Sequence, residues 1–176
     1  MSEIATLITH GLTVVGQGLA TASDLSGVRP RQKASLYADP LSWLVFEAVE
    51  RAVADYGEEL LSEREDVGHI VISDHCTTHT MGSIGAEIPR GRISPLRFSG
   101  ANPGSICSLP SQFLGFSGPS MTLSMPPEKG SPTAVTIARS WLRQRSVAHV
   151  FVTTHSTRAS HHRVTSTILM QTQAGD

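Results

Sequence analysis

The sequence predicts an α/β domain in which helices flank a layered, mixed β-sheet. Short apolar stretches typical of buried strands alternate with longer stretches whose apolar residues recur at helical spacing. A strand, helix, strand, helix, strand order of this kind is typical of a sheet covered by helices. A chain of 176 residues is long enough to bury one core, so we expect residues 1–176 to form a single domain.

The N-terminal part is predicted to contain a strand, a loop and a long helix. Residues 12–15 form a short apolar run, and the polar, Gly- and Pro-punctuated residues 19–40 predict a loop. From Leu41 the apolar residues recur at i, i+3, i+4, i+7 and i+8. This spacing places them on one face of a helix that Gly57 is positioned to end.

The middle of the chain is predicted to be mostly irregular. Residues 70–72 predict a short buried strand, and residues 73–105 are rich in Ser, Thr, Gly and Pro. An irregular segment of this length is usually functional or ordered by a partner, so we expect a long loop there. A short helix around 108–114 and a strand at 121–123 are expected to follow.

The C-terminal part is predicted to contain a second long helix and two further strands. Ser131 is a candidate N-cap and Pro132 a candidate first helical residue. The apolar residues that follow them lie on one helical face. Residues 147–153 and 164–170 are rich in β-branched residues and predict the last two strands.

Composition limits the classes of partner and compartment. Apolar residues make up 39% of the chain, charged residues 16%, and the net charge is -1, so no basic excess attracts nucleic acid or an anionic membrane. No apolar run approaches the roughly 20 residues of a membrane span. Two cysteines make no disulfide framework, and the N-terminus lacks the pattern of a signal peptide. We therefore expect a cytoplasmic protein without nucleic-acid or membrane partners.

A histidine-rich run offers the first candidates for chemistry. His75-Cys76-Thr77-Thr78-His79 brings imidazole and thiol groups together at short spacing, as metal or nucleophilic sites do. A zinc site needs a further ligand pair, and His155, His161 and His162 come without a second cysteine pair. We therefore favour a polar loop after a strand, and we expect neither a metal nor another cofactor.

Cys107 and Glu128 are further candidates. Cys107 could be a nucleophile, but a lone cysteine in a Gly-, Ser- and Pro-rich segment is more often a small buried side chain. The segment from Glu128 to Ser131 could form a helix N-terminus that binds an anion. A capped helix start with an acidic residue in its first turn is the favoured interpretation.

Several segments in the correct order resemble the β-ketoacyl synthases of the thiolase fold. They are Ile93 to Pro103 (ISPLRFSGANP), Gly118 to Ser124 (GPSMTLS), the helix through Ala138-Arg139 and the strand at 147–153. The resemblance extends from about Leu12 to Leu169 and implies half of a thiolase-like fold.

In that family a Gly-Pro-x-x-Thr strand runs into an Ala-Cys turn, and the nucleophilic cysteine begins a buried helix. Counting nine residues on from Gly118, or twelve back from Arg139, gives Pro127. Gly130 then matches the small residue after the cysteine. Proline has no thiol and no backbone N–H, so the resemblance implies that thioester chemistry is absent at Pro127.

The resemblance also implies a missing half and a partner. Ketosynthases carry two catalytic histidines and a lysine in a second, duplicated half, and this chain ends about one strand after the core of the first. A single half would expose apolar surface that the second half normally covers. We therefore expect a dimer, either with a ketosynthase subunit or with a second copy of this chain.

The chain resembles more narrowly the chain-length-factor-like proteins, which lack the nucleophile and pair with an active type II ketosynthase. In such dimers the segment before the nucleophile strand lies at the subunit interface. The matching residues here are Phe98, Asn102, Phe113 and Phe116. An equally supported alternative is that these aromatic residues fill the chain's own core.

Three hypotheses for function follow. The first is a non-catalytic ketosynthase-like subunit that binds a synthase or an acyl carrier protein in polyketide or fatty-acid-type biosynthesis. The second is a repurposed enzyme for acyl transfer, hydrolysis, cyclisation or dehydration that uses His75, Cys76, His79, Cys107 or Glu128, and it requires at least two of them to converge. The third is a self-associating remnant without a chemical role.

Overall fold

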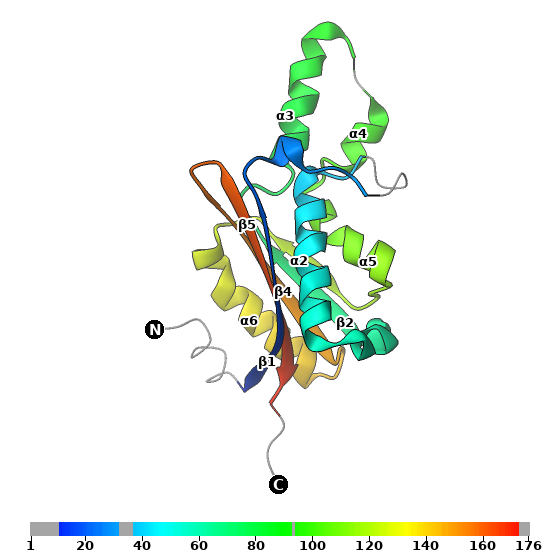
Figure 1. The fold of residues 1–176 in the computed structure, drawn as a ribbon, viewed down its shortest axis with the longest axis vertical. Helices are drawn as coiled ribbons and strands as arrows, with labels where there is room; N and C mark the ends of the chain where they lie inside the picture. Colours follow the sequence, from blue (N-terminus) through cyan, green and yellow to red (C-terminus); the bar gives the residue numbers. More distant parts are fainter. Residues whose placement is uncertain (1–10, 32–36, 93, 173–176) are drawn as a thin grey trace.

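The computed structural model describes residues 11–31, 37–92 and 94–172, which form a five-stranded mixed sheet with helices on both faces (Figure 1). The strands are β1 (Leu12–Ala22), β2 (Val67–Ile72), β3 (Ser120–Leu123), β4 (His149–Arg158) and β5 (His161–Gln171). Their order across the sheet is β1-β5-β4-β2-β3. This architecture confirms the predicted fold class; the ends of the predicted domain, residues 1–10 and 173–176, lie outside the described residues.

The sheet combines a parallel half with an antiparallel half. β2 pairs in parallel with β3 on one side and β4 on the other. β4 and β5 form an antiparallel hairpin, and β5 pairs antiparallel with β1. Every residue of β2 is buried, because the parallel half is covered by helices on both faces. β1 and β3 are the two edge strands.

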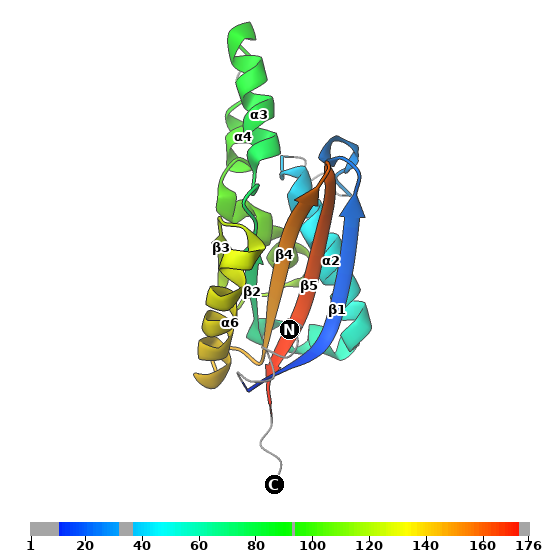
Figure 2. The ribbon, with the colours of Figure 1, turned by 90° about the vertical axis from the view of Figure 1, so that its left-hand side faces the viewer.

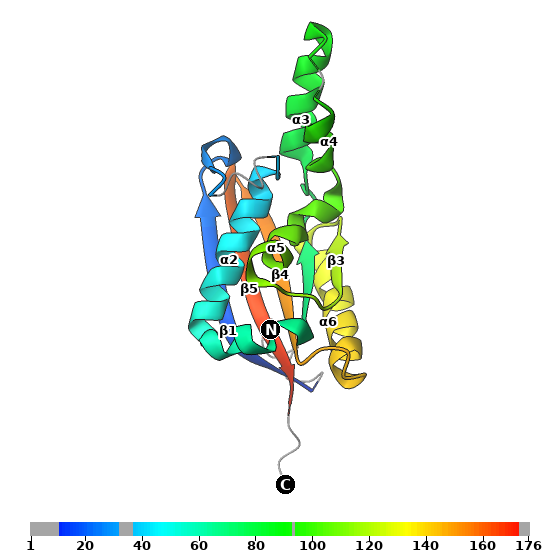
Figure 3. The same cartoon turned by 90° about the vertical axis from the view of Figure 1, so that its right-hand side faces the viewer.

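The long helices cover opposite faces of the sheet. α2 (Pro40–Tyr56) lies on one face together with α5 (Ser108–Leu114), and α6 (Pro127–Arg143) lies on the other (Figures 2 and 3). The buried face of α2 packs against residues such as Val71, Val164 and Ile168, and that of α6 against Ile70 and Ile72. α2 begins near Leu41 and ends at Gly57, which has φ 126°, as predicted.

The segment 73–105 is largely helical, so the prediction of a long loop was wrong. It contains α3 (Thr78–Glu87), α4 (Pro95–Ser99) and two 3-10 turns, Ile88–Arg90 and Pro103–Cys107. We call the described residues of 78–99 the arm, because α3 and α4 project beyond the end of the sheet (Figures 1 to 3). The weak helical periodicity arises because α3 is mostly exposed and has one fully buried position, Ile84.

Two further predictions are corrected. Residues 19–22 continue β1 rather than starting a loop, because β1 pairs with β5 along its whole length; part of the expected loop, residues 32–36, lies outside the described residues. α6 begins at Pro127 rather than near Ser131, since proline suits a first helical position. Ser131 is inside the helix, where its Oγ donates to the carbonyl of Pro127 at 2.7 Å.

Candidate functional site

Pro127 occupies the helix position at which the resemblance places a nucleophile. It is the first residue of α6 and follows β3 after a short turn, so the order strand, turn, helix is that of the family pattern. Gly130 lies one turn further along, and a Cβ there would come within 2.5 Å of Cγ2 of Ile72. The small residue allows α6 to pack closely on β2, while the position of the nucleophile carries no thiol.

Cys107 and Glu128 lie on opposite sides of the sheet. Cys107 is buried on the α2 face, where its thiol donates to the carbonyl of Gly104 at 3.0 Å and accepts from Oγ1 of Thr122 at 3.7 Å. Glu128 is exposed in the first turn of α6 on the other face. Cys107 is therefore the small buried side chain of the favoured interpretation, and the structure does not bring it together with Glu128.

Cys76 is held in a turn after β2. Its thiol donates to the carbonyl of Ser73 at 3.0 Å and lies 3.4 Å from Oγ of Ser124. Burial raises the pKa of the Cys76 thiol above its usual value. Since the thiolate is the nucleophilic form, this environment makes Cys76 a poor nucleophile at neutral pH.

A cluster of imidazoles lies at the ends of β2 and β4, beside the root of the arm. Oγ of Ser73 and Nδ1 of His155 are 2.9 Å apart, and Nε2 of His155 and Nδ1 of His162 are also 2.9 Å apart. The rings of His155 and His162 are nearly parallel, with 6° between their planes. The ring of His75 stands edge-on to both, with centroid distances of 5.4 and 6.1 Å.

The cluster favours neutral imidazoles. Burial, together with the neighbouring imidazoles of His162 and His75, lowers the pKa of His155 to about 4. Burial also lowers the pKa of His162, with His75 and His79 acting in the same direction and Asp24 opposing them. Both side chains therefore carry no charge at neutral pH.

The histidine run thus converges with groups that sequence reasoning did not combine with it. His75 and His79 were singled out for their spacing along the chain, whereas Ser73 was not singled out, and His155 and His162 were not assigned to the same site. The sequence feature that could have identified them is that Ser73 directly follows one apolar strand and His155 lies within another. Ser73 follows β2, and β2 and β4 pair in parallel up to Ile72 and Thr154, which brings Ser73 beside His155.

Within the described ranges, no group of three or more His, Cys, Asp or Glu side chains is arranged to hold a metal ion. The same part of the chain contains no helix that is both long and apolar enough to cross a membrane.

The predicted interface residues divide into two pairs. Phe98 and Asn102 are exposed, and Asn102 uses its side chain to cap the turn at Gly104. Phe113 stacks on a buried aromatic cluster, and Phe116 is 3% exposed and packs against the core. Phe113 and Phe116 therefore contribute to the chain's own core. The role of these four residues at an interface stays a prediction. Of the four, Phe98 and Asn102 are the ones whose side chains are exposed to a partner.

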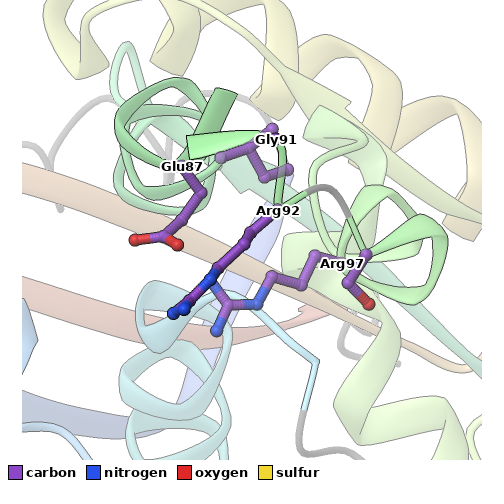
Figure 4. A pocket seen from close by; sticks show the side chains of 6 residues that line it. Glu87, Gly91, Arg92 and Arg97 are labelled. Atoms are coloured by element: carbon purple, nitrogen blue, oxygen red, sulfur yellow. The ribbon is translucent and has the colours of Figure 1, made fainter. Parts of the chain in front are cut away.

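The arm carries a positively charged hollow between α3 and α4. Figure 4 shows Arg92 and Arg97 at this hollow, which Glu87 also lines. Glu87 pairs with Arg90 at 2.8 Å. Within the described residues, Arg92 and Arg97 have no ion-pair partner, so this surface of the arm is basic in a chain whose net charge is -1.

The structure is similar to known ketosynthases, although no family model and no curated protein matches the sequence. The ishigamide ketosynthase/chain length factor matches with a TM-score of 0.75 and 11% identity, over 94% of this chain and 63% of that chain. The chain has the ketosynthase fold. A type II acyl-carrier protein complex with its ketosynthase, AntDE:AntF, matches with a TM-score of 0.70 and 13% identity, over 92% of this chain and 63% of that chain.

A third match is a ketosynthase-fold complex that contains a chain length factor. The ketosynthase ApeO with its chain length factor ApeC, from Xenorhabdus doucetiae, gives a TM-score of 0.63 and 12% identity, over 92% of this chain and 79% of that chain. The thiolase-like fold predicted from the resemblance is confirmed. The chain spans about 63% of the length of the first two ketosynthase chains it matches.

Proposed function

We propose that this chain is a ketosynthase-like subunit of the chain-length-factor type, without condensing activity of its own, that pairs with a ketosynthase in polyketide or fatty-acid-type biosynthesis. Pro127 carries the proposal. It begins the helix after β3, the position of the nucleophile in the resemblance, and it can neither form a thioester nor donate a backbone hydrogen bond.

Exposed apolar surface supports pairing. The described residues include seven large exposed apolar side chains, and five of them lie on the arm or on β3: Met81, Ile88, Leu96, Phe98 and Met121. β3 is also an edge strand, so one side of its backbone is free to pair with another chain. An apolar arm beside a free strand edge is the kind of surface that a partner subunit covers.

The matched structures indicate which class of protein the partner belongs to. Two of the matched structures are named as ketosynthases with chain length factors, and one as a ketosynthase with its acyl-carrier protein. A ketosynthase subunit is the partner we propose, with a second copy of this chain as the alternative and an acyl carrier protein as a further ligand of the complex. We place the complex in the cytoplasm.

The test is co-expression with each candidate ketosynthase from the same source, followed by light scattering and an acyl-carrier-protein loading assay. We expect a one-to-one complex whose loading is abolished by mutating the ketosynthase's cysteine and is unaffected by Cys76→Ala or Cys107→Ala in this chain. A chain that stays monomeric with every ketosynthase tested contradicts the proposal.

The repurposed enzyme is the second candidate, and one observation favours it: His75 and Cys76 converge with Ser73, His155 and His162. Against it, Ser73 and His155 are fully buried and the pKa of the Cys76 thiol is raised. Turnover of an acyl substrate by the isolated chain, stopped by Cys76→Ala, Cys107→Ala or Glu128→Gln, would establish the enzyme instead.

A further inference from the structure

The hydroxyl of Ser73 has a fully determined set of hydrogen bonds. Its Oγ accepts from the backbone N–H of His75 at 3.2 Å and from that of Cys76 at 2.9 Å. A hydroxyl has two acceptor lone pairs and one proton. Because both lone pairs are occupied, the proton of Ser73 is left to donate to Nδ1 of His155, 2.9 Å away.

This assignment fixes the tautomers of both histidines. Since Nδ1 of His155 accepts, a neutral His155 carries its proton on Nε2 and donates it to Nδ1 of His162. A neutral His162 then carries its own proton on Nε2. Ser73, His155 and His162 therefore form a directional relay that runs from the buried end of β2 through β4 to the half-exposed start of β5.

The same hydrogen bonds argue against a metal on His155. A histidine that binds a metal through Nε2 usually donates its Nδ1–H to an oxygen acceptor. Here that oxygen is Oγ of Ser73, which already accepts two amide protons. The hydrogen bonds therefore favour neutral histidines with their protons on Nε2 over a histidine bound to a metal.

The inner end of the relay holds the root of the arm. The amides of His75 and Cys76 belong to the turn that leads into α3. The next residue, Thr77, donates from Oγ1 to the carbonyl of Ala101 at 2.6 Å. This hydrogen bond joins the segment that enters the arm to the segment that leaves it. Loss of a hydrogen bond to Ser73 therefore loosens the turn from which the arm leaves the sheet.

Protonation of His162 is incompatible with this arrangement of protons. Protonated His162 places a proton on Nδ1, facing the Nε2–H of His155. Relief requires either separation of the two rings or a shift of the His155 proton to Nδ1, which then faces Ser73. In the second case Ser73 must stop accepting one of the two amides, because it cannot accept three protons.

Charged and titratable groups surround the relay on every side. Asp74 and His75 face it from the turn after β2, and His79 faces it from α3. Asp24 faces it from the segment after β1, and Asp39 from the start of α2. Burial and the imidazoles of His75 and His79 disfavour a positive charge on His162, whereas Asp24 and Asp39 favour it.

We propose that Ser73, His155 and His162 form a proton-sensitive latch, which holds the root of the arm while both imidazoles are neutral and releases it when His162 takes up a proton. The latch goes beyond the proposed function, and it involves no residue of a partner. Its test uses the isolated chain, so its failure leaves the pairing with a ketosynthase untouched.

The first experiment reads the tautomers. Long-range proton–nitrogen spectra of the imidazoles are recorded on the ¹⁵N-labelled full chain at about pH 7.5, where both histidines are expected to be neutral. We expect the Nε2–H tautomer for His155 and for His162. An Nδ1–H tautomer at either residue overturns the latch.

The second experiment follows release of the arm. Amide-exchange protection of His75 and Cys76, corrected for intrinsic rates, is compared with that of Ile70 in β2 between about pH 7.5 and about pH 4.5. We expect protection of the two turn amides to fall about tenfold, as for the loss of one buried hydrogen bond, together with protonation of His162. Constant protection across that titration overturns the proposal.

Variants separate the latch from general acid sensitivity. His162→Asn keeps an acceptor for His155 but cannot titrate, so release should move to lower pH. His161→Asn, at the neighbouring exposed position, should behave as the unmodified chain does. Ser73→Ala should release the two amides at every pH, and if that variant fails to fold, equal behaviour of the His162 and His161 variants is sufficient to reject the latch.

Discussion

The carboxylate of Asp39 joins the first turn of α2 to the arm. Its Oδ1 accepts from the backbone N–H of Leu41 at 2.8 Å, and its Oδ2 accepts from that of Thr80 in α3 at 2.9 Å. Asp39 is fully buried, so no water replaces either bond. One residue therefore caps a core helix and fixes the helix that projects from it.

Asp39→Ala should destabilise the chain by about 2–4 kcal/mol, since it removes a helix cap and a charge-assisted hydrogen bond and leaves two donors without their acceptor. Asp39→Asn keeps one carbonyl oxygen and should cost less. Urea unfolding measures the loss for both variants. Equal stability of the Ala variant and the unmodified chain would show that the cap contributes nothing.

Stability should fall as the pH drops from 6.5 towards 4. Burial lowers the pKa of His69 and of His155 to about 4, below the value of 6.5 expected in the unfolded chain. The unfolded state therefore binds more protons in this range, and the stabilisation that is complete above pH 6.5 is lost on acidification. We expect a loss of about 2 kcal/mol per histidine by about pH 5.

His69→Asn tests this assignment. The ring of His69 is buried and its Nε2 lies 3.0 Å from Oγ1 of Thr153. The variant should be less stable at neutral pH but lose less stability on acidification, because one of the two buried imidazoles no longer titrates. His161→Asn, at an exposed position, is the matched control. An unchanged pH slope in the His69 variant would mean that other groups dominate.

Gly130→Ala should destabilise the chain by about 1–3 kcal/mol. The added Cβ would lie 2.5 Å from Cγ2 of Ile72, a β-branched side chain with little freedom to move. Gly82→Ala is the control, because a Cβ at Gly82 in α3 meets nothing within 4 Å. Alanine there should stabilise by about 0.5–1 kcal/mol through helix propensity. Thermal unfolding of both variants measures the contrast.

The sequence predicted those parts of the fold whose apolar pattern faces the core. α2 has a buried face that repeats at helical spacing, and the strand at 70–72 is buried throughout, so both were placed correctly. The strand at 121–123 was also placed correctly, although it is only partly buried. The arm was missed because most of α3 faces solvent, with Ile84 buried, so no apolar stripe marks it. The start of α6 was misplaced because Ser131 resembles an N-cap, while Pro127 also suits a first turn.

The candidate site was predictable only in part, because its geometry depends on strand pairing. The spacing of His75 and His79 is visible along the chain, but the contact between Ser73 and His155 joins residues 82 positions apart. That contact follows from the parallel register of β2 and β4, which no local pattern specifies. Pro127 was found from two independent counts because it lies within a continuous strand, turn and helix.

Pro127→Cys should give the start of α6 a reactive thiol. A cysteine at the first position of α6 lies at the positive end of the helix dipole, which favours the thiolate. It should be alkylated faster than Cys76 and Cys107, both of which are buried. Mass spectrometry after brief iodoacetamide treatment measures the labelling. Labelling of the introduced thiol no faster than that of Cys76 and Cys107 would contradict the prediction.

Met121→Arg should weaken pairing with the ketosynthase at least tenfold if β3 is the edge that meets the partner. Met121 is 37% exposed on β3, and a charge placed at the centre of an apolar contact is left without a counter-charge. Leu19→Arg is the matched control, since Leu19 is 39% exposed on β1 at the opposite edge of the sheet. Titration of each variant with the ketosynthase, followed by light scattering, gives the comparison. Equal weakening by both variants would move the interface away from β3, and weakening by Leu19→Arg alone would assign it to β1.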